Sequence, residues 1–228
     1  MTAEEAEAPS AAGRTALEVT FTAPVVSFRN PLYAGVQVSL PCPPPATVGG
    51  ALAAAAGGWA QVDPGLRFAM AFRAGGKGMD YETYHPLDGS GKRTSPTPRN
   101  REFLTDARLT IWLVDEPELW RRRLRRPVWP LRLGRSQDLV GLEMHQVSLR
   151  AAPGSQRHAV VPDERGAPGT LLRLPTAVAH GRGRTQWDAY RFDSSGRAER
   201  PVTDSLSTDD GQAVALLPCT HPDTGLRS

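Results

Sequence analysis

Residues 127–141, PVWPLRLGRSQDLVG, connect two segments whose apolar residues repeat with different periods. The segment before them has apolar residues at helical spacing, and Pro127 ends this predicted helix. Its apolar residues are Leu119, Trp120 and Leu124. From Val140 on, apolar residues alternate with polar or small ones, as at Leu142 and Met144. This alternation is typical of a half-buried strand. The stretch is therefore predicted to be a helix-to-strand connection at the lip of a sheet.

The connection itself combines a glycine with several hydrogen-bond donors. Gly134 can adopt a positive φ and lets a ligand approach the backbone closely. Arg132, Arg135 and Ser136 supply charged and neutral donors that suit phosphate oxygens. Two interpretations remain open from the spacing alone: an anion-binding cradle, and a plain glycine turn with solvated arginines.

The segments upstream complete an alternation of strands and helices. Period-two patterns predict three strands, at 17–28, 66–72 and 103–113. An alanine-rich helix is predicted from Thr47, a good N-cap residue, to Gly57–Gly58, which ends it. Asp115 and Glu118 resemble a capping box at the start of the second helix. The order strand, helix, strand, strand, helix, strand predicts an α+β protein with a ferredoxin-like (RRM-like) fold.

Three parts of the chain are expected. Residues 1–15 are predicted to be a disordered leader, residues 16–149 the ferredoxin-like domain, and residues 150–228 a small β-rich C-terminal lobe. The segment 74–100 lacks apolar periodicity, and an unstructured insertion of this length is usually functional. It contains basic and aromatic residues that could contact a single strand of nucleic acid, Lys77, Lys92, Arg93 and Arg99 with Tyr81 and Tyr84. A flexible solvent-exposed loop is the alternative.

Positive charge is concentrated in one segment. The formal net charge is only +3, but Arg121–Arg135 contains seven arginines and no carboxylate. Such a segment creates a local field that attracts a polyanion. The alternative for its helical part is an ordinary solvated face.

Patterns typical of catalytic, metal-binding or membrane proteins are weak. Cys42 and Cys219 lack zinc-site spacing and predict a reduced, cytoplasmic setting. The five histidines form no HExxH motif, and Ser136 does not lie in a GxSxG turn. We therefore expect no catalytic residues, no metal or cofactor and no membrane partner.

Four motifs, taken together and in this order, resemble the CRISPR-associated protein 5 family of the RAMP superfamily. They are FRNPLY (28–33), PPPATVGGALAAAAGG (43–58), PRNREFL (98–104) and PLRLGRSQDLV (130–140). The resemblance covers roughly residues 17–149. It implies a ferredoxin-like domain with an inserted hairpin, the thumb, at residues 74–100.

The resemblance also implies a function and partners. It identifies the chain as a non-catalytic subunit of a type I Cascade surveillance complex in antiviral defence, one that binds and caps the five-prime handle of the crRNA. The implied partners are the crRNA, the backbone subunit, the large subunit and, indirectly, target DNA. The family's motifs place the handle-binding residues at Gly134, Arg135 and Ser136 in the glycine-rich loop, Arg29 at the end of the first strand, and Arg99 and Arg101 where the thumb rejoins the sheet.

Two competing functions remain at this stage. Some members of one subtype cut precursor crRNA with a tyrosine and an adjacent Lys-His pair, and this chain has no such pair. The absence favours a non-catalytic member most similar to subtype I-B. A metal-independent endoribonuclease using His85, Tyr84 and Lys77 is the enzymatic alternative, and a protein-only adaptor whose basic helix docks an acidic partner is the third.

Overall fold

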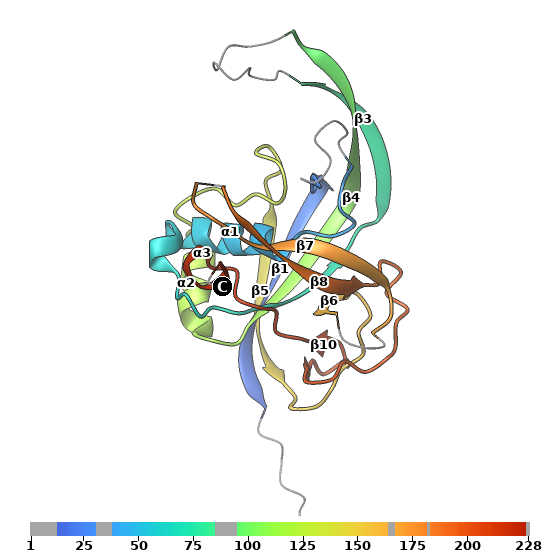
Figure 1. The fold of residues 1–228 in the computed structure, drawn as a ribbon. Helices are drawn as coiled ribbons and strands as arrows, with labels where there is room; N and C mark the ends of the chain where they lie inside the picture. Colours follow the sequence, from blue (N-terminus) through green and yellow to red (C-terminus); the bar gives the residue numbers. More distant parts are fainter. Residues whose placement is uncertain (1–12, 31–37, 85–94, 164–166, 182, 227–228) are drawn as a thin grey trace, which may run out of the picture.

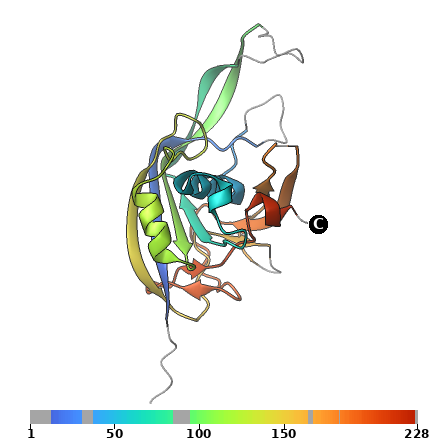
Figure 2. The same cartoon turned by 90° about the vertical axis from the view of Figure 1, so that its left-hand side faces the viewer.

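The computed structural model describes residues 13–30, 38–84, 95–163, 167–181 and 183–226. An antiparallel sheet forms its centre, and helices cover one sheet face (Figures 1 and 2). In chain order the elements are β1 (Arg14–Val26), α1 (Pro45–Ala56), the 3-10 turn η1 (Trp59–Gln61), β2 (Ala69–Arg73), β3 (Gly76–Tyr84), β4 (Thr97–Leu113), α2 (Pro117–Arg125), β5 (Gly141–Leu149), β6 (Ala159–Pro162), β7 (Thr170–Val178), β8 (Thr185–Phe192), β9 (Leu206–Ser207), β10 (Ala213–Val214) and α3 (Pro222–Gly225).

The four central strands confirm the predicted order of elements. They lie in the order β5-β1-β4-β2, with α1 following β1 and α2 following β4. In β1, Val19 is paired with Ile111 of β4 and Met144 of β5, so the apolar residues of three strands share one face. Helices α1 and α2 bury this face with residues such as Leu52 and Leu124. Alternation was a reliable guide here because only one face of each strand is buried.

Both predicted helix starts are wrong in detail. Helix α1 begins at Pro45 with Pro44 as its N-cap, not at Thr47, because proline is well suited to the first helical position. Helix α2 has Glu116 as its N-cap, with φ 49° and no side-chain capping bond. Asp115 instead accepts a hydrogen bond from Arg14 at 2.6 Å, so the predicted capping box is absent.

The range 74–100 was expected to be unstructured from its lack of periodicity, and the family resemblance implied a hairpin there; it is largely part of a hairpin. Strand β3 pairs with the first half of β4, from Gly76 opposite Thr105 to Tyr84 opposite Thr97, and the hairpin projects from the sheet (Figure 1). Its residues show no apolar alternation because most of them are exposed or only partly buried on both faces. Residues 85–94 of the predicted insertion lie outside the described residues.

The limits of the predicted leader and C-terminal lobe also change. Strand β1 begins at Arg14, inside the range 1–15, and residues 1–12 lie outside the described residues. The region 150–228 is β-rich as expected, but β6 pairs with β2 and is followed by β8 and β7 in the same sheet. Leu174 and Tyr190 join the central core, so this region extends the sheet, while a small cluster of its own forms around Val161, Val202 and Ala215.

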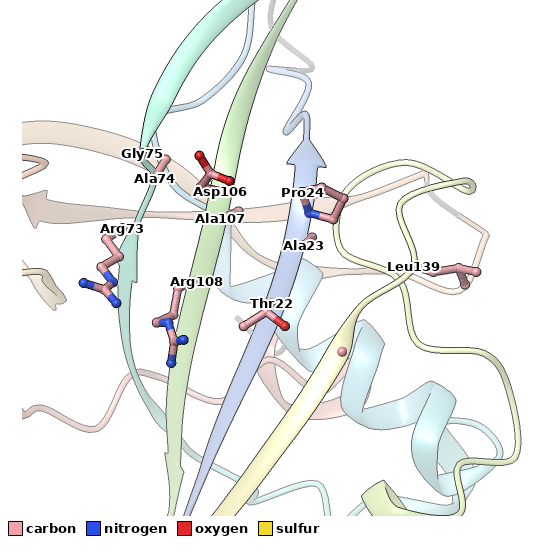
Figure 3. Close-up of a pocket in the computed structure, with 11 residues that line it drawn as sticks. Thr22, Ala23, Pro24, Arg73, Ala74, Gly75, Asp106, Ala107, Arg108 and Leu139 are labelled. Atoms are coloured by element: carbon pink, nitrogen blue, oxygen red, sulfur yellow. The ribbon is translucent and has the colours of Figure 1, made fainter.

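The face opposite the helices is only partly open. A small cluster around Trp112 brings the β9–β10 region onto this face through Leu206 and Val214. The rest of the face carries polar side chains from the central strands, such as Thr22 and Arg108 (Figure 3). No helix in the described part of the chain is long and apolar enough to cross a membrane.

Candidate nucleic-acid interface

Three segments that are far apart in the sequence meet at one end of the sheet: the end of β1, the base of the β3–β4 hairpin, and residues 131–139, which we call the glycine turn. Gly134 has φ 96°, and a Cβ built there would lie 2.5 Å from the Ser27 carbonyl oxygen. The Ser27 hydroxyl donates to the Glu102 carbonyl oxygen in β4 at 2.8 Å. Ser27 therefore joins the glycine turn to the hairpin base, and only glycine fits at position 134.

The glycine turn is anchored at both ends and presents backbone donors between them. Leu131 and Leu133 are buried, and the Leu133 amide donates to the Asp138 carbonyl oxygen at 3.0 Å. Among the described residues, the amides of Gly134, Ser136 and Gln137 have no hydrogen-bond partner. Successive free N–H groups in a turn are suited to binding an anion.

Arg135 is held by an internal ion pair. Its Nε and Nη2 atoms each donate to a carboxylate oxygen of Asp138 at 2.8 Å. The Asp138 side chain is only 4% exposed and that of Arg135 18%. A bidentate pair of this kind fixes the shape of the turn. The Arg135 guanidinium is therefore bonded to Asp138 within the protein and is not a free phosphate ligand.

Arg101 is also held by ion pairs, within the hairpin base. Its Nε donates to Asp80 at 3.0 Å and its Nη1 lies 3.0 Å from a carboxylate oxygen of Glu82, while its own side chain is 9% exposed. Hydrogen bonds from Arg101 lower the pKa of the Asp80 carboxyl, and the charges of Arg101 and Arg135 lower it further. Arg101 of β4 therefore ties the two strands of the hairpin together.

Lys77 and Glu102 form a second ion pair at the hairpin base. The Lys77 Nζ lies 3.0 Å from Glu102, whose other carboxylate oxygen accepts the Ser39 amide at 3.1 Å. The bond from Lys77 lowers the pKa of the Glu102 carboxyl, and the bond from Ser39 also lowers it. Lys77 remains largely exposed on the hairpin surface.

The structure brings together part of the predicted site. Five of the predicted residues belong to the glycine turn or the hairpin base: Gly134, Arg135, Ser136, Lys77 and Arg101. Arg29 follows Ser27 and is exposed. Arg132 is exposed on the turn. Arg99 is exposed on the hairpin, opposite Glu82. Lys92, Arg93 and His85 lie outside the described residues, and of Tyr84 only the backbone is described.

The sequence did not indicate a hollow on the helix-free face beside the glycine turn. It has a volume of about 700 Å³ and is lined by Arg73, Arg108 and Asp106 together with small and apolar residues (Figure 3). Arg73 and Arg108 lie directly opposite each other on β2 and β4. Only strand register, which sequence reasoning did not assign, reveals this pairing.

The arginines around α2 form a separate exposed surface. Arg122, Arg125 and Arg126 are exposed and have no carboxylate partner among the described residues, and Trp129 beside them is 59% exposed. Arg123 instead lies over the ring of buried Trp120, 5.1 Å from its centroid. Exposed cations beside an aromatic ring are typical of a surface that binds single-stranded nucleic acid.

The cysteines have the environments of structural residues. Cys42 is fully buried, and burial raises the pKa of its thiol. Cys219 is partly exposed. Within the described ranges, no group of three His, Cys, Asp or Glu side chains could hold a metal ion.

The sheet order and the helices on one face define a class of protein, an α+β fold of the ferredoxin-like type. A family model described as "CRISPR-associated protein (Cas_Cas5)" matches residues 16–206. The chain therefore belongs to the CRISPR-associated protein 5 family, which confirms the family predicted from the four motifs. No curated protein matches the chain in sequence at a significant level.

Two solved structures share the fold. A chain of "CRISPR RNA-guided surveillance complex" aligns with a TM-score of 0.52 at 18% identity, over 92% of this chain and 92% of that chain. A chain of "Cryo-EM structure of the Type III-B Cmr-beta bound to cognate target RNA and AMPPnP, state 1" aligns with a TM-score of 0.53 at 8% identity, over 78% of this chain and 84% of that chain. At these identities the likeness concerns the fold alone.

Proposed function

We propose that the chain is a guide-RNA-binding subunit of a type I Cascade complex, most similar to subtype I-B, without catalytic activity of its own. In this role it binds and caps the five-prime handle of the crRNA and bridges the large subunit to the backbone filament. The observation that carries the proposal is the convergence of the end of β1, the glycine turn and the hairpin base at one end of the sheet. Family membership supports it, as does the shared fold with a chain of an RNA-guided surveillance complex.

The exposed donors of this junction would contact the RNA backbone. The free amides of Gly134 and Ser136 suit phosphate oxygens, and the exposed side chains of Arg29 and Arg132 add positive charge. Arg135 and Arg101 act differently, because each is bonded to carboxylates and holds the turn or the hairpin in shape. Binding of this kind weakens as salt rises, since phosphate contacts release counterions.

The hairpin would act as the thumb that kinks the RNA and contacts the neighbouring backbone subunit. Met79 and Tyr81 lie on one face of β3 and are 62% and 81% exposed. Alternate residues of a strand share a face, so these two side chains form one apolar surface on the projecting hairpin. A surface of this kind is suited to stacking on an unpaired base or packing against another subunit.

Guide retention in the assembled complex tests the handle-binding role. The chain is co-expressed with the other Cascade subunits, either as wild type or with Arg29→Ala and Arg132→Ala together, and crRNA per complex is quantified after purification. We expect the double variant to bind handle RNA about tenfold more weakly. Arg173→Ala, an exposed arginine on the edge strand β7, is the matched control. Wild-type complexes without crRNA, or unchanged retention in the double variant, would contradict the proposal.

Incubation of the purified chain with repeat RNA in EDTA tests the absence of catalysis. We expect the RNA to stay intact, because the Lys77 ammonium is paired with Glu102 at 3.0 Å and the chain has no adjacent Lys-His pair. A single specific cut, lost on Lys77→Ala, would overturn the non-catalytic assignment and favour the endoribonuclease.

A further inference from the structure

The hollow on the helix-free face lies between the glycine turn and the hairpin base and is lined by residues of both. Leu139 of the turn lies on one side, and Gly75 and Asp106 at the base of the hairpin lie on the other (Figure 3). Its volume of about 700 Å³ is in the range of pockets that hold small ligands. The hollow therefore continues the proposed RNA-binding junction onto the open face of the sheet.

Two arginines at this hollow face each other, and carboxylates do not fully balance their positive charges. Arg73 of β2 and Arg108 of β4 are register partners, and their guanidinium groups lie on the same face (Figure 3). Like charges directly opposite each other destabilise a sheet. Among the described residues, Arg108 has one ion pair, with Glu143 at 3.8 Å, and Arg73 has none, although Asp106 lines the same hollow. An anion between the two side chains would remove this repulsion.

Asp106 adds a carboxylate, and so a hydrogen-bond acceptor, to the hollow. Its carboxylate has no hydrogen-bond or ion-pair partner in the described part of the chain, and its backbone has φ 48°. A Cβ on Gly75 would lie 2.9 Å from the Asp106 Cβ, so the two residues are closely packed at the hairpin base. A free carboxylate repels a simple anion but accepts hydrogen bonds from the amino or ring N–H groups of a nucleobase.

A second hollow, of about 420 Å³, meets the first at the same two arginines. It extends toward His158, whose buried Nδ1 has no hydrogen-bond partner among the described residues. Burial lowers the pKa of His158, and the charge of Arg73 lowers it further. The arginine pair thus lies where the two hollows meet, and the groove that they form together is also lined by the carboxylates of Glu18 and Asp210.

We propose that the hollow between Leu139 and Asp106 holds one splayed nucleotide of single-stranded RNA. Arg73 and Arg108 bind its phosphate, Asp106 accepts a hydrogen bond from its base, and Leu139, which is 58% exposed, packs against the base or sugar. This inference rests on the proposed function, because the RNA that enters here is the guide RNA held by the adjacent glycine turn. Unpaired bases that are turned out and read individually are the usual targets of sequence-specific RNA recognition.

Fluorescence anisotropy with the full-length chain and labelled handle RNA tests the proposal. The RNA is used intact and with an abasic site at each position in turn. For the wild type, we expect the abasic site at one position to lower the affinity about tenfold, as the loss of one stacked base does. Arg73→Ala with Arg108→Ala should lower the affinity for intact RNA and remove the effect of that abasic site, whereas Arg173→Ala should change neither.

Asp106→Asn tests the base contact without altering the backbone. Asparagine tolerates a left-handed conformation as aspartate does, but it replaces a carboxylate oxygen with an amide donor. We expect a changed base preference at the same position and an unchanged melting temperature. Asp204→Asn is the matched control, since Asp204 is also exposed with positive φ, at 57°, and lies outside both hollows.

The outcomes separate this inference from the proposed function. If the double arginine variant and Asp106→Asn give the wild-type profile, the nucleotide site is wrong while handle binding stands. If the double arginine variant keeps its RNA but loses a subunit from the purified complex, the groove is a protein contact and the inference is overturned. If the wild-type chain fails to bind handle RNA, both alone and in the complex, the proposed function itself fails.

Discussion

The arginines of the hairpin base and glycine turn and those at the end of α2 have the same side chain in opposite surroundings. Arg101 and Arg135 are largely buried and bonded to carboxylates. Arg122, Arg125 and Arg126 are exposed and have no carboxylate partner in the described ranges. The comparison shows that Arg101 and Arg135, which are bonded to carboxylates, serve the architecture, whereas the exposed arginines are available to a polyanion.

The physical basis of this difference is desolvation. A buried charge must be paired, because its lost hydration is not otherwise replaced. An exposed arginine stays hydrated at little cost and gives up only weakly held counterions when it meets a phosphate. Substitutions in the two sets should therefore affect different quantities, stability for the first and salt-dependent binding for the second.

The largest effect is expected for Arg135→Ala. Removing the guanidinium leaves the Asp138 carboxylate, which is 4% exposed, without its partner. Breaking a buried pair in this way costs about 3 kcal/mol. The free energy of unfolding, measured by urea denaturation, should fall by this amount, and RNA binding should fall with it because the turn loses its shape. Arg135→Ala combined with Asp138→Ala should recover part of the stability; a single variant as stable as wild type would contradict the role assigned to the pair.

Gly134→Ala should have the next largest effect on stability. Its Cβ would meet the Ser27 carbonyl oxygen at 2.5 Å, and alanine would have to adopt φ 96°. A strained residue of this kind costs about 2 kcal/mol. Thermal melting measures the loss, with Gly181→Ala as the control, because a Cβ at Gly181 meets no atom within 4 Å and its φ is not left-handed. Equal melting temperatures for the two variants would mean that the turn moves freely away from β1.

Arg101→Met should lower the free energy of unfolding by less, about 1 kcal/mol. The side chains of its partners Asp80 and Glu82 are 40% and 39% exposed, so solvent screens their attraction to Arg101. The effect depends on pH. Arg101 lowers the pKa of Asp80 in the folded state, so the pair stabilises the fold above the ordinary aspartate pKa near 4 and loses this contribution as pH falls below it. The difference between wild type and variant in urea denaturation should be largest at pH 7 and should shrink as pH falls below 4. A difference that stays the same from pH 7 to pH 2 would mean that packing, not charge, explains the loss.

The smallest effect on stability is expected for the joint replacement of Arg122, Arg125 and Arg126 by serine. All three are exposed, and surface changes of this kind usually stay within about 0.5 kcal/mol. If these residues contact RNA, the slope of log K against log salt should become less steep by about 0.7 for each lost phosphate contact. An unchanged slope would confine RNA binding to the glycine turn and the hairpin.

Sequence reasoning succeeded where one side of an element is buried. The alternation in 17–28 and 103–113 predicted β1 and most of β4 because the core selects apolar residues at every second position. It failed for β3, whose residues face solvent on both sides and therefore carry no such signal. It also failed for the helix starts at Pro45 and Pro117, where proline at the first position replaced the predicted side-chain caps.

The candidate site was predictable only in part for a related reason. Gly134 was identified from its local sequence, but its close approach to Ser27 depends on two segments more than a hundred residues apart in the chain. The ion pair of Arg101 with Asp80 follows from the hairpin register, and the facing of Arg73 and Arg108 follows from the register of β2 with β4. Register depends on which faces are buried in the folded sheet, and local composition does not specify it.

By itself the sequence determined the order of the four central strands and their two helices, the family, and the glycine at the helix-to-strand connection, because each depends on local periodicity or on motifs that are continuous in the chain. The tertiary structure alone decided which arginines are neutralised and which are exposed, that the region 150–228 extends the central sheet, and that two arginines face each other above an open hollow. These properties depend on burial and on distances between segments remote in sequence, and those quantities exist only once the chain has folded.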